Sequence, residues 1–116
     1  MSYEKYLLTR ESESVTLDLP YAEGEEEIKV VLRPLSWAKK NSLVSQCTQY
    51  TSDGNVAFNG QKYINEVLMY IVTEAPWGKT DDMFLAKVNL TLGGALEKLV
   101  PSAIDENLAE TTENLV

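Results

Sequence analysis

Histidine is absent from the 116-residue sequence, and this absence removes several classes of chemistry. Without an imidazole, the chain has no His general acid or base, no Ser-His-Asp or Cys-His nucleophile, and no His metal ligand. A pair of carboxylates remains a formal route to catalysis, but the acidic residues fall in expected loops and tails rather than around an expected cleft. We therefore predict a protein that is not an enzyme and that uses no cofactor or metal ion.

Cysteine is nearly absent as well. Cys47 is the only one, so no disulfide can form within the chain. A free thiol fits a reducing compartment. Cys47 occupies an apolar position of an expected helix, which favours a buried structural role over a reactive thiol.

Basic residues are scarce: 10 Lys and Arg face 18 Asp and Glu, for a net charge of -8. The cations are scattered, and only Lys39 and Lys40 among the Lys residues are adjacent. An acidic surface of this kind repels nucleic-acid phosphates and anionic lipid headgroups. We predict that neither nucleic acid nor a membrane is a partner.

Long hydrophobic runs are missing too. The most strongly apolar stretch is interrupted by Glu66 and Glu74, so we expect no transmembrane helix. The first ten residues contain no apolar core of signal-peptide length. These patterns favour a protein that is made and kept in the cytoplasm.

The best-patterned segment present is residues 61–75, which we predict to be an amphipathic helix ending before Pro76. Its apolar residues recur at the three-and-four spacing of one helix face. They are Ile64, Val67, Leu68, Ile71, Val72 and Ala75.

Strict alternation of apolar and polar residues predicts a β-hairpin over residues 14–33. Its tip contains Pro20, Gly24 and the acidic run 25–27. That run is either a docking patch for a basic partner or a solvated loop. A lone hairpin is marginally stable, so we expect one of its faces to pack on helices.

Three further helices are expected, at about 37–50, 81–90 and 92–100. Ser36 and Thr80 are their predicted N-caps, and Asp81 with Asp82 suits a helix start better than a cation site. Gly93 and Gly94 favour either a separate short helix or a continuation of the preceding helix that bends at the two glycines. Trp37 is either an exposed anchor for a partner or, as we expect, the residue that joins the hairpin to the first helix in the core. Turn dipeptides bound residues 51–60, where we expect a short extended segment at Val56–Phe58 with Phe58 facing inward.

Together these elements predict an α+β fold: a single domain at residues 14–104 in which the N-terminal β-hairpin packs on a small bundle of three to four helices. Residues 1–13 are predicted to be an N-terminal arm, and residues 105–116 an acidic, mobile tail.

Tyr63 and Tyr70 lie nearly two turns apart on the central helix, so they fall in line beside its apolar stripe. They either edge the core with their hydroxyls in water or form part of a partner-binding edge.

The order of elements over residues 27–104 resembles the small tail assembly chaperones of long-tailed bacteriophages. Four segments carry the resemblance. They are the residues between the strand and the first helix, a turn followed by a short extended segment, a helix that ends at Ala-Pro, and a last short helix. In this sequence these are Leu32-Arg33-Pro34-Leu35-Ser36, Asp53-Gly54-Asn55-Val56-Ala57-Phe58, Ile71-Val72-Thr73-Glu74-Ala75-Pro76-Trp77 and Leu92-Gly93-Gly94-Ala95-Leu96-Glu97-Lys98-Leu99.

The resemblance implies a non-catalytic protein in the cytoplasm of the bacterial host. Such a chaperone coats the long apolar tape measure protein, keeps it soluble, helps recruit tail tube subunits, and is often also made in a longer, frameshifted form. Self-association is a further option. An aromatic edge on an acidic domain suits the helix-in-groove mode of binding. The expected contact surface is Tyr63, Tyr70, Trp77 and Phe84.

Two other functions remain open. The first is a virion structural protein, either a tail-completion or a head–tail connector subunit. The second is an acidic inhibitor that mimics nucleic acid. An inhibitor of that kind needs acidic side chains spaced like phosphates along one surface, whereas the acidic residues here gather at an expected loop tip and tail.

Overall fold

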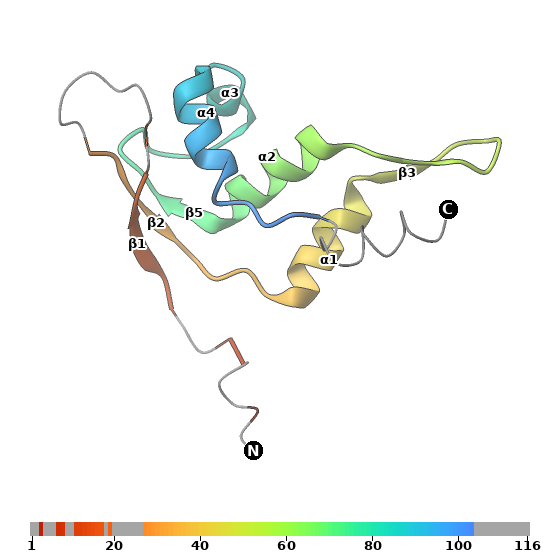
Figure 1. Ribbon diagram of the computed structural model, residues 1–116, viewed down its shortest axis with the longest axis horizontal. Helices are drawn as coiled ribbons and strands as arrows, with labels where there is room; N and C mark the ends of the chain where they lie inside the picture. Colours follow the sequence, from red (N-terminus) through yellow and green to blue (C-terminus); the bar gives the residue numbers. More distant parts are fainter. Residues whose placement is uncertain (1–2, 4–6, 9–10, 18, 20–26, 104–116) are drawn as a thin grey trace, which may run out of the picture.

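The computed structural model describes residues 3, 7–8, 11–17, 19 and 27–103 (Figure 1). Most of the predicted arm, the hairpin tip with Glu25 and Glu26, and the predicted tail lie outside these residues. The elements in chain order are β1 (Glu13–Thr16), β2 (Lys29–Leu32), α1 (Trp37–Gln46), β3 (Thr48–Tyr50), β4 (Val56–Phe58), α2 (Gly60–Ile71), β5 (Val72–Glu74), α3 (Asp82–Leu85) and α4 (Leu90–Glu97).

The predicted α+β class is confirmed. β1 and β2 form the expected antiparallel hairpin, with Val15 opposite Val30. β5 then pairs antiparallel with the other side of β2, which gives a three-stranded sheet in the order β1-β2-β5. The alternating pattern works as predicted on the buried face of β2, where Val30 is 1% exposed.

The core forms around α2, which lies centrally among the other elements (Figure 1). Val67, Leu68 and Ile71 of α2 are buried, as the spacing of its apolar residues predicts. Side chains from the sheet, α1 and α4 close around this stripe. The buried cluster is Leu17, Val30, Leu43, Cys47, Tyr63, Val67, Leu68, Ile71, Val72, Ala95 and Leu96.

The central helix is shorter than the predicted 61–75. It ends at Ile71, and the chain passes directly into β5. The β-branched residues Val72 and Thr73 suit a strand, and pairing with β2 starts at Val72, opposite Leu32, before Pro76 is reached. The Arg33 N–H donates to the Ile71 carbonyl at 2.8 Å, which fixes the sheet to the end of the helix.

The first helix also ends early, at Gln46 rather than near residue 50. Ser36 caps it as predicted, accepting a hydrogen bond from the Lys39 N–H at 3.0 Å. The Thr48 hydroxyl donates to the Val44 carbonyl at 2.7 Å and helps to satisfy the last turn. Residues 48–50 then form β3, since Thr and Tyr favour extended backbone.

The two C-terminal helices differ from the predicted 81–90 and 92–100. α3 is a single turn, and Asp81 caps it in place of the predicted Thr80. α4 begins earlier, with Asn89 as its cap, and Gly93 and Gly94 lie inside it without a break. Packing of Ala95 and Leu96 against the core offsets the low helix propensity of the two glycines.

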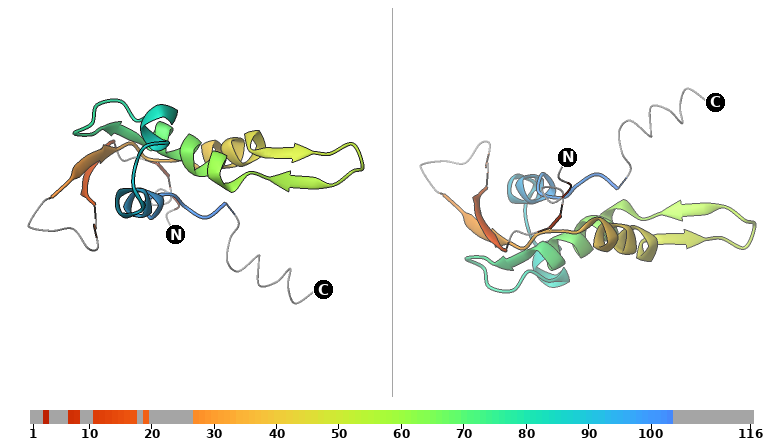
Figure 2. Two further views of the ribbon diagram at one scale, coloured as in Figure 1. Left: turned by 90° about the horizontal axis from the view of Figure 1, so that it is seen from above. Right: turned by 90° about the horizontal axis from the view of Figure 1, so that it is seen from below.

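Two aromatic residues were predicted to face inward and do not. Trp37 is 81% exposed, so it does not join the hairpin to α1 in the core. Phe58 is 40% exposed, because it belongs to a second hairpin that extends beyond the helices (Figure 2).

α4 offers a matched pair of leucines for testing the core. Leu96 is fully buried, whereas Leu90 is 96% exposed. We expect Leu96→Ala to lower the free energy of unfolding by about 2–5 kcal/mol through lost burial and a cavity. We expect Leu90→Ala to change it by less than about 0.5 kcal/mol. Urea denaturation followed by circular dichroism measures both, and equal losses would contradict this packing.

Candidate partner-binding surface

The second hairpin consists of β3 and β4, paired antiparallel with Gln49 opposite Ala57. Gly54 takes a left-handed backbone conformation, φ 86°, as the predicted Asp-Gly turn requires. The Thr51 N–H donates to the Asn55 carbonyl at 2.8 Å and closes the turn. The Thr51 hydroxyl and the Asn55 side-chain amide both donate to the Asp53 carboxylate. The turn is therefore built by its own side chains.

One face of this hairpin is apolar and open to solvent. Side chains of directly opposed residues share a face, so Tyr50 lies beside Val56, and Thr48 beside Phe58. The opposite face carries only Gln49 and Ala57. We call Tyr50, Val56 and Phe58 the hairpin face; they are 80%, 59% and 40% exposed.

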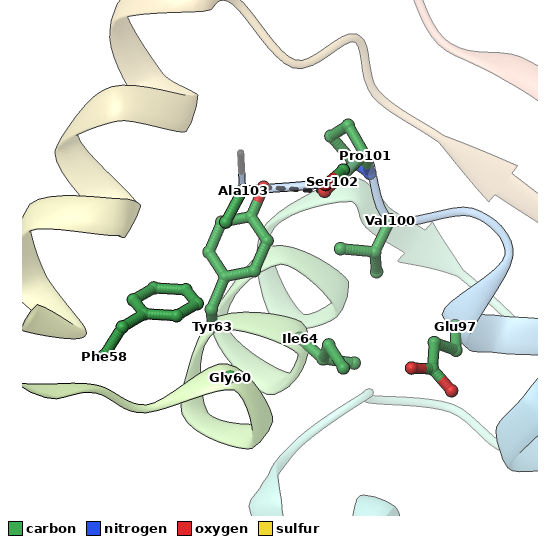
Figure 3. Close-up of a pocket in the computed structure, with 9 residues that line it drawn as sticks. All are labelled: Phe58, Gly60, Tyr63, Ile64, Glu97, Val100, Pro101, Ser102 and Ala103. Carbon is green, nitrogen blue, oxygen red and sulfur yellow. Dashed lines mark hydrogen bonds between the residues drawn. The ribbon is translucent and has the colours of Figure 1, made fainter. Parts of the chain in front are cut away.

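The hairpin face continues into a groove of about 290 Å³ between the start of α2 and the chain that follows α4 (Figure 3). Phe58 belongs to both, and its ring lies 5.7 Å from the ring of Tyr63, measured between centroids. Glu97 is the one acidic residue in the lining. We call this the Tyr63 groove; its lining is Phe58, Gly60, Tyr63, Ile64, Glu97, Val100, Pro101, Ser102 and Ala103.

Tyr63 forms the inner wall of the groove rather than an exposed edge. It is 3% exposed, and its hydroxyl donates to the Pro101 carbonyl at 2.9 Å (Figure 3). Burial raises its pKa above the ordinary value. The alternative in which the Tyr63 hydroxyl lies in water is therefore wrong. Tyr63 instead holds the chain after α4 against α2.

The other three predicted contact residues have different environments. The partly buried Tyr70 ring lies beneath two cations, with the Arg33 guanidinium carbon at 4.3 Å and the Lys39 Nζ at 4.8 Å from its centroid. Such contacts connect α1, and the residue that follows β2, to α2. The four residues thus do not share a single local environment.

Trp77 and Phe84 are stacked, with ring centroids 4.6 Å apart. The Trp77 Nε1–H donates to the hydroxyl of the buried Thr80 at 2.8 Å. Both rings pack against the core and connect α3 to it, so their described contacts are structural.

Cys47 is buried as predicted, at 1% exposed. Burial, as the largest effect, raises the pKa of its thiol; Lys62 opposes this and Glu66 adds to it. A thiol with a raised pKa is a poor nucleophile at neutral pH. The buried structural role is the one that this environment supports.

The hairpin face was missed because the first helix was predicted to run through Tyr50. The signal was present: β-favouring residues two apart on each side of an Asp-Gly turn, here Thr48 and Tyr50 before it and Val56 and Phe58 after it, are typical of a hairpin. Val100 and Ala103 of the groove carry no comparable signal, because a fold-dependent contact places them beside Tyr63.

Among the described residues, no three acidic or Cys side chains are close enough together to hold a metal ion. None of the described helices has the length and apolar character needed to cross a membrane. Comparisons with models of protein families, with curated proteins and with solved structures found no match.

The role of Tyr63 can be tested by removing its hydroxyl. Tyr63→Phe removes the hydrogen bond to the Pro101 carbonyl, so we expect a loss of about 0.5–1.5 kcal/mol in unfolding free energy. Tyr70→Phe is the matched control, because the ring that faces Arg33 and Lys39 is kept. Equal effects of the two variants in urea denaturation would contradict the assignment.

The turn of the second hairpin makes a prediction about pH. Hydrogen bonds, first from Thr51 and then from Asn55, hold the pKa of Asp53 below its ordinary value of 3.8. The contribution of these bonds is complete above the unfolded-state pKa and is lost as the pH falls through the lower folded-state pKa. An NMR titration should place the Asp53 midpoint below 3.8, and Thr51→Val should raise it. An unchanged midpoint in Thr51→Val would refute this cause.

Proposed function

We propose that this protein is a tail assembly chaperone of a long-tailed bacteriophage, acting without catalysis in the cytoplasm of the bacterial host. It binds the tape measure protein, keeps it soluble during tail assembly and helps to recruit tail tube subunits. The observation that supports this best is a continuous apolar surface, formed by the hairpin face and the Tyr63 groove, on an acidic protein.

The surface suits an amphipathic helix. Such a helix presents apolar side chains along one stripe, and these can lie across the hairpin face while one of them enters the groove. Tyr50 and Phe58 supply aromatic contacts, which often contribute most to binding energy. Contacts of this kind need no specific sequence in the partner, which is what a protein covering a long repetitive apolar rod requires.

Charge supports the same role. Residues 48–60 carry one charged side chain, Asp53, although the whole chain carries a net charge of -8. A partner bound there is covered by an apolar surface, while the acidic remainder faces water and keeps the complex soluble. The same charge disfavours binding to nucleic acid or to an anionic membrane.

A virion structural protein, such as a tail-completion or head–tail connector subunit, is the second candidate. The projecting hairpin supports it, because a neighbouring subunit of a particle can add a strand to an open sheet edge. Mass spectrometry of purified particles separates the two functions. We expect this protein to be absent; its presence at a stoichiometric level would favour the structural subunit.

The chaperone proposal is tested by co-expression with the long helical protein expected to be encoded beside this chain. Val56→Asp places a charge on the hairpin face, and we expect the amount of soluble partner recovered with it to fall more than about tenfold. Gln49→Asp places the same charge on the opposite face and should leave recovery unchanged. Thermal melts check that both variants fold equally well. Full recovery with Val56→Asp would refute the hairpin face as the binding surface.

A further inference from the structure

The β3–β4 hairpin has two open edges. Within the described part of the chain no other strand pairs with either β3 or β4, and no side chain of β4 is buried. A two-stranded hairpin is marginal by itself, and further strands with a shared apolar face stabilise it. The hairpin also extends beyond the helices (Figure 2).

The backbone groups that point outward from β4 lie symmetrically on either side of Ala57. The Thr51 N–H donates to the Asn55 carbonyl, and the Asn59 N–H donates to the Cys47 carbonyl. Hydrogen-bonded pairs alternate in an antiparallel ladder, so Ala57 directs its N–H and carbonyl toward β3. Val56 and Phe58, on either side of it, direct theirs outward.

From this geometry we propose that the protein forms a two-fold dimer in which β4 pairs antiparallel with β4 of a second copy. The two-fold axis passes beside Ala57. Val56 of one copy then exchanges backbone hydrogen bonds with Phe58 of the other, and the reverse pair does the same. This surface is complementary to itself, as a two-fold interface requires.

The side chains match as well as the backbone. Val56 and Phe58 lie on the same face. Val56 of one copy therefore contacts Phe58 of the other as an apolar cross-strand pair, and the reverse pair does the same. The two Ala57 side chains meet on the opposite face. They form a non-hydrogen-bonded pair, in which opposed side chains lie closest together, so small side chains fit there. Pairing through β3 instead would place Thr48 beside Tyr50, a less apolar pair.

Charge selects the same region. Two copies of a chain with a net charge of -8 repel one another, and they can approach most easily where charges are fewest. β4 has no charged residue, whereas protected strand edges often carry lysine or proline. The occupant of this edge is thus a second copy, and its pairing joins the two hairpin faces into one wider apolar surface.

The dimer is tested with the isolated chain, so the outcome does not depend on the proposed function. Ala57→Glu places two negative charges opposite each other at the two-fold axis and leaves the hairpin face apolar. Ala57→Lys does the same with positive charges. Gln49→Glu is the matched control, with one charge added on the same face but away from the axis.

Sedimentation over a concentration series should give twice the 13.0 kDa chain mass for the wild type and for Gln49→Glu. Ala57→Glu and Ala57→Lys should each sediment as monomers, and an equimolar mixture of the two should recover the doubled mass. A wild type that stays monomeric, an Ala57→Glu variant that stays dimeric, a Gln49→Glu variant that dissociates, or a mixture that stays monomeric would each overturn the proposal.

Discussion

Burial of one stripe of α2 is the interaction on which the rest of the structure depends. Val67, Leu68 and Ile71 give the sheet, α1 and α4 a common apolar surface to pack against. None of these elements is stable alone: the strands are short, and α1 and α4 have only 10 and 8 residues. The elements that carry the candidate surface are held in place by the same helix, since Tyr63 belongs to both the core and the groove.

The sequence predicted structure best where the apolar residues follow a single clear periodicity. The three-and-four spacing of α2 and the alternation of β1 and β2 identify the elements and their buried faces. Element ends were predicted less well, because local propensity competes there with pairing partners distant in sequence. Pro76 explains why a helix cannot continue, but the pairing of Val72 with Leu32 ends it earlier. Gly93 and Gly94 are helical for the same kind of reason: tertiary packing outweighs propensity.

The candidate surface was harder to predict. The aromatic residues predicted as the contact surface lie near the edge of a core stripe, and the contacts described for them are packing contacts within the chain. They are Tyr63, Tyr70, Trp77 and Phe84. Sequence spacing gives the angle of a side chain around its helix, but it does not say which neighbouring segment covers it. The chain at Pro101 and Ala103 covers Tyr63, and only the fold brings those residues there.

The segment from Val56 to Glu74 passes from β4 through α2 to β5 with a single intervening residue, Asn59. The Asn59 N–H donates to the Cys47 carbonyl, and the Arg33 N–H donates to the Ile71 carbonyl, so each junction is also tied to a neighbouring strand or helix. No flexible linker therefore separates the projecting hairpin from the three-stranded sheet. The two ends of the molecule are therefore joined by continuous secondary structure.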